Sequence, residues 1–474
     1  MKILHVIDGK ETDSVDGTTY DDIDPFTRAA YASVARGSAA DVDLAVAAAR
    51  RAFDTGPWPR MGFAERGRLL HRFAELIERN AEELADAETR DMGKPRVAAA
   101  GHDVPRAAAN IRFFADHARL SAAEALPSDA GHHVYVRYES AGVVAAIAPW
   151  NFPLMLATWK IAPALAWGNT VVLKPAEDTP RSAALLGRLA LEAGIPEGVL
   201  NVVLGYGDAG AALTRHPGVD RITFTGSSAT GRTIAGVAAQ HLTPVSLELG
   251  GKGAALVFDD ADLDSAVEWT IKAAFSNTGQ VCLAGSRLYV QQGVYDDFLT
   301  RFTTAAEALR LGDPSASDTE IGPLAGAQHF GKVGVYLDER ALGGGRIVTG
   351  GLDHDWFVRP TVVTDVPAHA PIQQDEVFGP VVTVTPMASE EEGVALANGT
   401  PYGLSAMAFT ENVHRAHRVA AGLRSGNVWI NCFFVRDLRA PFGGVGASGI
   451  GREGGTFSRE FFTEPKSVTM RISA

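Results

Sequence analysis

VVAAIAP at residues 143–149 is the first of four short apolar runs that decide the fold; TVVLKP (170–175), VLNVVLG (199–205) and RITFTG (221–226) follow it. Each run is β-rich and ends in a turn signal, which is typical of a strand buried inside a sheet. Segments with a helical pattern separate the runs, for example RSAALLGRLALEAG at 181–194. Strands that alternate with helices predict a parallel, doubly wound sheet.

Helical patterns precede these runs, and a second unit follows them. Ser38 and Asp41 resemble a capping box, and a long helical stretch is predicted from about residue 63 to 91. After the fourth run the alternation begins again, with the strand pattern AALVF (254–258) and the helical pattern DLDSAVEWTIKAAF (262–275). The chain therefore predicts two α/β units.

Two segments alternate apolar and polar residues in the manner of edge strands: HHVYVRYES (132–140) and KSVTMRI (466–472). Such strands could pair with another subunit. Strands that close their own domain are an equally good interpretation.

Size and composition exclude several classes of protein. A prior of about 150 residues per domain predicts two or three domains for 474 residues. The net charge of −13, without a long Lys/Arg run, argues against nucleic-acid binding. No window approaches the roughly 18 apolar residues of a membrane span, and the N-terminus lacks the cleavage site of a signal peptide. We therefore expect a cytoplasmic protein.

The two cysteines, Cys282 and Cys432, give no disulfide framework, and no His/Cys cluster has zinc spacing, so no metal is expected. Cys282 follows a polar loop in FSNTGQVCLAGSR, which favours an exposed thiol over a packed one. A nucleophilic cysteine needs a neighbour that removes its proton. Glu248, before two glycines in SLELGGK, is the leading candidate for this base, although such a Glu is more often a solvated turn residue.

Asn151 lies in PWNFP (149–153), directly after the first strand. Two prolines and two aromatic residues make this a rigid corner, which can aim the side-chain amide at one fixed point. That suits an oxyanion donor. The alternative is an Asn that satisfies the backbone of its own turn.

ITFTGSSATG (222–231) places two glycines, with the spacing G-x4-G, where a strand passes into a helix. Gly226 permits a close backbone approach, the helix N-terminus attracts a phosphate, and Ser227 adds a hydroxyl. Turn chemistry alone explains the same residues and is the favoured interpretation when this motif is taken by itself.

Lys174 and Glu177 follow the strand TVVLKP, at the kind of strand end where α/β sheets bind ligands. They could hold ribose hydroxyls or form a solvated ion pair. In a ribose pocket, Glu177 favours NAD over NADP, because its carboxylate repels a 2′-phosphate.

Seven motifs in order resemble the aldehyde dehydrogenase superfamily, from about Ser38 to the C-terminus. They are PWNFP (149–153), KPAE (174–177), FTGS (224–227), ELGGK (248–252), GQVC (279–282), EVFGPV (376–381) and PFGG (441–444). Each motif is weak alone, but the ordered set is very specific.

The resemblance implies NAD as cofactor and a role for each matched residue. Cys282 would be the nucleophile, Glu248 the base that activates water, Asn151 an oxyanion donor together with the Cys282 N–H, and Lys160 a support for proton relay. The implied cofactor contacts are Trp150, Lys174, Glu177, Gly226, Ser227, Gly231, Leu249, Gly250, Glu376 and Phe378. The implied reaction is NAD-dependent oxidation of an aldehyde to a carboxylate through a thioester on Cys282.

The same pattern places Arg106, Phe152, Met155, Trp159 and the segment NCFFVRDLRAPFGG (431–444), which contains Arg436 and Arg439, around the substrate. A buried arginine is costly unless it meets an anion, so Arg106 and Arg436 would suit a substrate carboxylate. Arg439 could equally form an internal ion pair with Asp437.

The segment VRDLR (435–439) is similar to the dehydrogenases of 2-hydroxymuconic and 5-carboxymethyl-2-hydroxymuconic semialdehydes, intermediates of aromatic catabolism. The alternatives are a broad-specificity or betaine-type enzyme, a coenzyme A-acylating one, and a non-catalytic member of the fold. The arginines argue against a cationic substrate, and Glu248 argues against acylation of coenzyme A.

The resemblance also implies the domain organisation. We expect a Rossmann-like NAD-binding domain (1–121 and 141–249), an α/β catalytic domain (250–445) and a small β oligomerisation arm (122–140 and 460–474), in a homodimer or homotetramer.

Overall fold

A computed structural model describes residues 1–127 and 131–472, and its first sheet contains the four apolar runs. Five neighbouring strands are parallel, and β20, β2 and β3 extend them antiparallel at the two edges. In spatial order the strands are β20 (Gly449–Ile450), β12 (Val245–Glu248), β11 (Arg221–Thr225), β8 (Val143–Ile147), β9 (Thr170–Lys174), β10 (Leu200–Val202), β2 (His5–Ile7) and β3 (Lys10–Thr12). Residues 449–450 thus return to the first sheet, which the sequence did not indicate.

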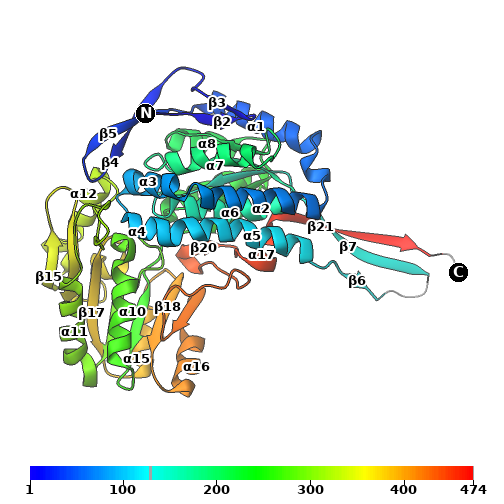
Figure 1. Ribbon diagram of the computed structural model, residues 1–474. Coiled ribbons are helices and arrows are strands. Elements are labelled where there is room, and N and C mark those ends of the chain that lie inside the picture. The colour runs from blue at the N-terminus through cyan, green and yellow to red at the C-terminus, as the bar shows by residue number, and fades with distance from the viewer. Residues whose placement is uncertain (128–130, 473–474) are drawn as a thin grey trace.

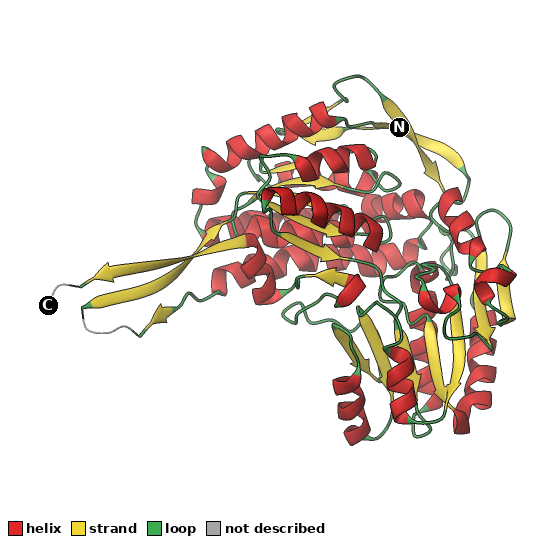
Figure 2. Cartoon of the chain, turned by 180° about the vertical axis from the view of Figure 1, so that it is seen from behind, coloured by secondary structure: helices red, strands yellow, loops and turns green. Residues whose placement is uncertain are grey.

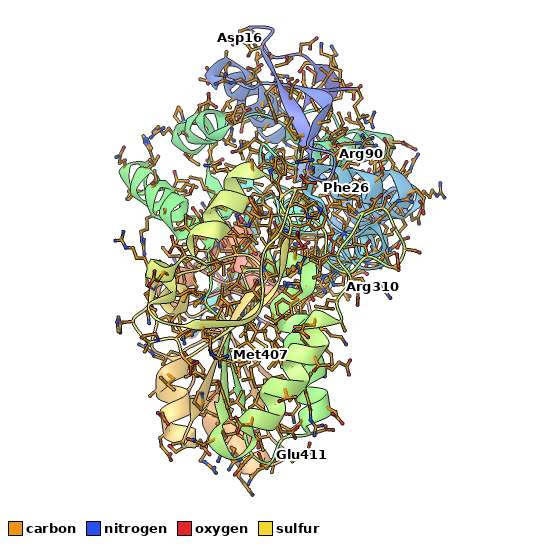
Figure 3. All side chains as sticks on the ribbon, turned by 90° about the vertical axis from the view of Figure 1, so that its left-hand side faces the viewer. Asp16, Phe26, Arg90, Arg310, Met407 and Glu411 are labelled. Carbon is orange, nitrogen blue, oxygen red and sulfur yellow. The ribbon has the colours of Figure 1, made fainter. Side chains whose placement is uncertain are left out.

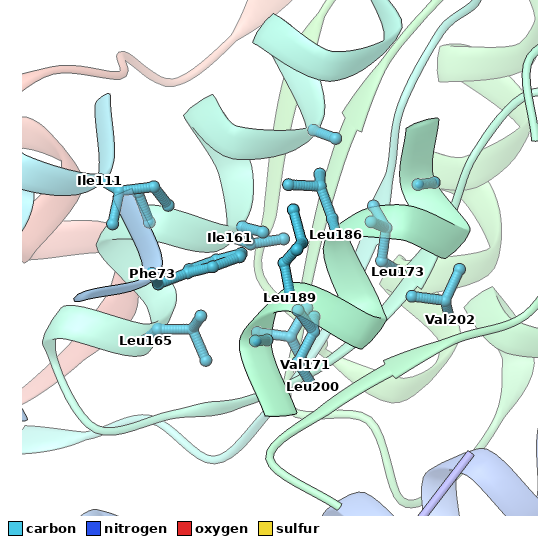
Figure 4. Packing of buried hydrophobic residues seen from close by; sticks show 14 of the residues in the cluster. Phe73, Ile111, Ile161, Leu165, Val171, Leu173, Leu186, Leu189, Leu200 and Val202 are labelled. Carbon is cyan, nitrogen blue, oxygen red and sulfur yellow. The ribbon is translucent and has the colours of Figure 1, made fainter. Parts of the chain in front are cut away.

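Helices cover both faces of this sheet. Successive strand residues point to opposite faces, so each strand contributes side chains to the two cores on either side. In β8, Val144 and Ala146 pack into one core, and Val143 and Ala145 into the other. Figure 4 shows part of the first core, where Phe73 and Ile161 meet strand residues. This core is covered by α2 (Phe63–Arg79), α3 (Ala81–Met92), α5 (Val104–Leu120), α6 (Pro153–Ala166) and α7 (Arg181–Glu192), and the other by α1 (Ala39–Asp54), α8 (Gly207–Arg215) and α9 (Ser228–His241).

The N-terminal helices agree with the sequence except at one point. The Asp41 carboxylate accepts hydrogen bonds from the backbone N–H and the hydroxyl of Ser38, so this capping interaction is confirmed. The segment predicted to be helical over about 63–91 is helical except at Asn80, where it divides into α2 and α3; the Asn80 side-chain amide donates to the carbonyl of Leu76.

The second sheet has seven strands, all parallel except the first. They are β15 (Arg346–Leu352), β16 (Val358–Thr364), β17 (Val381–Met387), β14 (Arg287–Gln291), β13 (Ala254–Val257), β18 (Ser405–Phe409) and β19 (Asn427–Ile430). Helices α10 (Leu263–Phe275) and α11 (Tyr295–Glu307) pack on one face, and α15 (Glu390–Ala397) and α16 (Val413–Gly422) lie on the other. Two α/β units are therefore present, and the α/β class is confirmed, while the exact domain boundaries stay a prediction.

The two alternating segments pair with each other and project from the body as an arm (Figure 2). β21 (Thr463–Arg471) runs antiparallel to β7 (His132–Ser140), and β6 (Ala125–Leu126) adds a short third strand. Residues 128–130 and 473–474 of the predicted arm lie outside the described residues. The strands therefore extend away from the domains instead of closing one (Figure 1).

A small N-terminal sheet links the two units. It consists of β1 (Lys2–Ile3), β5 (Ala29–Ala35) and β4 (Thr19–Asp24). From its turn, Phe26, labelled in Figure 3, packs edge-on against Phe357, with ring centroids 6.4 Å apart. Arg28 forms an ion pair with Asp355. Among the described residues, no helix is long and apolar enough to cross a membrane.

Candidate active site

A cavity of about 700 Å³ lies between the two sheets, and we call it the cofactor cavity. Strands β8, β11 and β12 are neighbours in the first sheet, so the segments after them meet at one edge. In parallel sheets this edge is where ligands bind. The cavity brings together many of the predicted residues: Trp150, Asn151, Gly226, Ser227, Leu249, Gly250, Cys282, Glu376 and Phe378.

Cys282 lies in the loop between a short 3₁₀ turn (Ser276–Gly279) and β14. Asn277, Thr278 and Gly279 all have left-handed backbones, with φ of 52°, 56° and 69°. At Gly279 a side chain is impossible, because a Cβ atom would lie 2.2 Å from the carbonyl oxygen of Gly379. This tight turn brings Cys282 to the cavity wall.

The Cys282 thiol rests protonated. Burial raises its pKa to about 12, and the nearby carboxylates of Glu376 and Glu248 act in the same direction. A thiolate at this position therefore requires a proton acceptor or added positive charge.

Asn151 is fixed beside the cysteine loop. Its Nδ2 donates to the carbonyl of Gln280 over 2.9 Å, and Asn277 Nδ2 donates to the carbonyl of Asn151 over 2.8 Å. A primary amide carries two N–H donors, and the bond to Gln280 uses one of them. The second donor leaves the side chain able to bind an oxygen in the cavity.

Glu248 ends β12 and is 4% exposed. Among the described residues, neither of its carboxylate oxygens has a hydrogen-bond partner. Burial and the neighbouring Glu453 raise its pKa well above the ordinary value, against the attraction of Lys160 and Arg436. When it is ionised, a carboxyl group with a raised pKa accepts a proton more readily than an ordinary one, which suits a general base.

A buried polar network lies close to Glu248. Lys160 Nζ, on α6, donates to Thr223 Oγ1 over 3.1 Å and to Glu453 Oε1 over 3.2 Å. Glu453 follows β20, and the sequence analysis missed it. Its only signal was a carboxylate in the glycine-rich segment GIGREGG (449–455).

One end of the cofactor cavity suits a phosphate. Ser227 is the N-cap of α9, and its hydroxyl accepts the backbone N–H of Thr230 over 3.2 Å. Gly231 allows the helix to pack on Leu249, since a Cβ atom there would lie 2.4 Å from that side chain. Lys174 and Glu177 are 3.6 Å apart, and neither lines the cavity, although the adjacent Asp178 does.

At the other end, Glu376 and Phe378 lie on one loop. Glu376 Oε1 accepts the backbone N–H of Gly251 over 2.9 Å, and burial raises the pKa of its carboxyl to about 7. The cavity is also lined by residues from the segment 325–332, including His329 and Lys332. No motif marked this segment, so only the tertiary structure reveals it. A helix N-terminus at one end and polar and aromatic groups at the other fit a dinucleotide.

A second cavity of about 460 Å³ reaches the cysteine loop through Asn277 and Val281. Phe152 lines it, together with Phe433 and Phe434. Its polar lining includes Lys94 and His102, and also Arg310, labelled in Figure 3. Phe433 and Phe434 belong to the segment 431–444 that the family pattern places around the substrate, whereas sequence reasoning missed Lys94, His102 and Arg310.

Two of the predicted arginines lie close together near the cysteine. The Arg436 guanidinium stacks on Trp159 and Phe442, at 4.7 and 3.8 Å from their ring centroids, and its Nη2 has no hydrogen-bond partner among the described residues. Burial lowers its pKa to about 10, and the charge of Arg106 adds to this effect. Two desolvated cations this close would gain from a shared anion.

Arg106 and Arg439 each have a hydrogen-bond partner within the protein. Arg106 Nε donates to Asn110 Oδ1 over 3.1 Å, and Asn110 Nδ2 donates to the carbonyl of Met155 over 3.1 Å. Arg439 is 78% exposed at its side chain and binds Asp437 with N–O distances of 2.6 and 2.9 Å. The ion-pair alternative for Arg439 is therefore what the structure contains.

Comparison with known proteins identifies the family to which this chain belongs. Residues 12–468 match the model of the aldehyde dehydrogenase family. The 2-hydroxymuconic semialdehyde dehydrogenase of Pseudomonas sp. (strain CF600) is 45% identical over 485 residues, covering 99% of this chain and 100% of that protein. The mitochondrial benzaldehyde dehydrogenase of Antirrhinum majus is 44% identical over 472 residues, covering 98% and 88%.

Among solved structures, the NAD⁺ complex of an aldehyde dehydrogenase from Bacillus cereus superposes with a TM-score of 0.98 at 40% identity, covering 100% of this chain and 97% of that one. The chain belongs to the aldehyde dehydrogenase family and is an NAD-dependent enzyme of that family.

Proposed function

We propose that this enzyme oxidises its aldehyde through a thioester on Cys282. One observation carries the proposal: Cys282 and Asn151 line the same cavity, and the buried carboxyl of Glu248 is close enough to raise the pKa of the thiol. A nucleophile, an oxyanion donor and a base are the three groups that acyl transfer needs.

In the first half of the reaction, Glu248 takes the proton from the thiol, and Sγ forms a bond to the carbonyl carbon. The carbonyl oxygen becomes an oxyanion, which accepts the free N–H of Asn151 and the backbone N–H of Cys282. NAD supplies the acceptor for the hydride of that carbon. The C–O double bond then forms again, and the acyl group remains on Cys282 as a thioester.

In the second half, Glu248 removes a proton from water, and the hydroxide attacks the thioester. The C–S bond breaks, the carboxylic acid leaves, and Cys282 takes a proton. Glu248 must release the protons it has accepted, and the buried Lys160–Glu453 pair is the proposed relay. Rapid mixing of Glu248→Gln with aldehyde and NAD tests this division: water is a weaker acid than a thiol, so we expect the steady state to slow far more than the burst of NADH. Equal slowing of both phases would contradict it.

We propose further that the substrate carries a carboxylate, as 2-hydroxymuconic or 5-carboxymethyl-2-hydroxymuconic semialdehyde does. The paired cations Arg106 and Arg436 support this, and so does the relative from Pseudomonas that is named for the first of these compounds. Kinetics with acidic, uncharged and trimethylammonium aldehydes provide the test. Equal kcat/KM for acidic and uncharged aldehydes would favour broad specificity instead; one relative is named for an uncharged aldehyde, benzaldehyde.

We also propose that the arm joins subunits in a homodimer or homotetramer. It projects from the body and exposes Leu126, Met470 and Ile472, apolar side chains that another subunit would cover. Light scattering of the intact chain and of a Met470→Glu variant tests this role.

A further inference from the structure

Helix α12 (Ala327–Val335) forms one wall of the cofactor cavity and also contacts the loop that bears Glu376 and Phe378. Val333 meets that loop at Gly379, where a Cβ atom would lie 2.9 Å from the valine side chain. One turn earlier on the helix, His329 faces the same loop. The described contacts of its imidazole all involve two other aromatic residues of the cavity wall.

These contacts form a closed triad of rings. The His329 ring lies 4.9 Å from the Trp150 ring and 5.9 Å from the Phe378 ring, centroid to centroid. Trp150 and Phe378 are 5.3 Å apart, with an angle of 87° between their planes. Edge-to-face pairs of this kind fix the orientation of all three rings.

A hydrogen bond ties the triad to a strained backbone. Phe378 has a φ of 60°, in the left-handed region that a bulky residue rarely adopts. His329 Nε2 lies 2.8 Å from the carbonyl oxygen of this residue, so the imidazole N–H donates to it. Strained conformations persist only where surrounding contacts hold them, and they cluster at functional sites.

The imidazole makes this contact without adding charge. Burial lowers the pKa of His329 to about 4, so the ring is neutral above about pH 5. A neutral donor does not repel the positive nicotinamide ring, as the cation of a lysine or an arginine would at the same position.

We propose that His329 is a positioning residue that holds Phe378 in its left-handed conformation and thereby sets the affinity for NAD. The inference rests on the placement of Phe378 beside the nicotinamide ring of NAD, which the resemblance to aldehyde dehydrogenases implies. It does not depend on the thioester, because NAD binds without aldehyde.

The test measures the Kd of NAD by calorimetry, without aldehyde, for His329→Ala, His329→Phe and His329→Gln. Loss of one hydrogen bond predicts an increase in Kd of about 5- to 10-fold for Ala and Phe. Gln can donate to the same carbonyl, so its Kd should stay within about 3-fold of the wild type. Val335→Ala is the matched control, because Val335 is an exposed residue of the same helix. Tm values confirm that each variant is folded, and His329→Phe replaces His329→Ala if the latter is not.

A double variant distinguishes positioning from direct contact with NAD. Glycine adopts a φ of 60° without cost, so a Phe378→Gly background should reduce the effect of His329→Ala to less than about 2-fold. The steady-state KM for NAD should rise with Kd, while the KM for the aldehyde stays unchanged. An equal effect of His329→Ala in both backgrounds, or a His329→Gln variant as weak as His329→Ala, would overturn the proposal. Unchanged turnover in Cys282→Ala would refute the proposed thioester but leave these Kd values valid.

Discussion

Two cavities meet at the cysteine loop, and they are built differently. The cofactor cavity lies where parallel strands end, and part of its lining is glycine backbone, at Gly226 and Gly250. The second cavity is lined chiefly by side chains from separate segments, such as Phe152, Lys94 and Phe434. A cavity lined by backbone suits a cofactor whose shape is constant. A cavity lined by side chains can be adapted to a different substrate by substituting those side chains. Substitutions on the two sides should therefore alter different kinetic constants.

The largest effect is expected at Cys282, which stands between the two cavities. Cys282→Ala removes the nucleophile, so turnover should fall by about 10⁴-fold or more. The Kd of NAD should stay unchanged, because the backbone frame of the cofactor cavity is intact. Steady-state NADH production and calorimetry measure the two quantities. Cys432→Ala is the control and should retain its activity, and wild-type turnover in Cys282→Ala would refute the mechanism.

The next effect is expected at Asn151. Loss of one oxyanion donor typically lowers kcat by about 10²–10³-fold. Asn151→Ala should do this with little change in Tm. Asn201, a buried asparagine of β10 that accepts the backbone N–H of Asp8, gives the matched control. Asn201→Ala should lower Tm and leave kcat nearly unchanged, and the reverse pattern would count against the assignment.

Substitutions of Arg436 and Arg439 should distinguish an arginine that binds the substrate from one that only stabilises its own loop. Hydrogen bonds to charged groups contribute about 1.5–3 kcal/mol, so Arg436→Ala should lower kcat/KM for an acidic aldehyde by about 10- to 100-fold. Its kcat/KM for an uncharged aldehyde should change much less. Arg439→Ala should change neither by more than about 3-fold, because that side chain is exposed and paired with Asp437. Equal losses with both aldehydes would show that Arg436 has only a structural role.

The smallest effect concerns the choice of cofactor. Glu177→Gln removes a charge that would repel a 2′-phosphate, so kcat/KM for NADP should rise by about 10-fold. Asp178→Asn is the control, because it makes the same charge change one residue away on the cavity wall. A similar gain in both variants would point to the overall charge of the cavity instead of a contact by Glu177.

The same contrast explains what the sequence could predict. The α/β class followed from the alternating strand and helix patterns, and the family and NAD followed from the resemblance of seven ordered motifs, such as FTGS (224–227) and GQVC (279–282). Close backbone approach and a reactive loop leave local patterns of this kind. The roles of the individual site residues stay predictions.

Other features had no local pattern. Glu453 reaches Lys160 only because residues 449–450 return to the first sheet, and His329 matters only through the conformation of Phe378. Packing between distant segments created these parts of the site.

The central claim is that the acyl group is carried by the sulfur of Cys282. Glu248→Gln, mixed with aldehyde and NAD and then quenched in acid, allows mass spectrometry of the peptide that contains this cysteine. The mechanism predicts that this peptide gains the mass of the acyl group, while the peptide of Cys432 is unmodified. An unmodified Cys282 peptide in a sample that has already released one equivalent of NADH would contradict it.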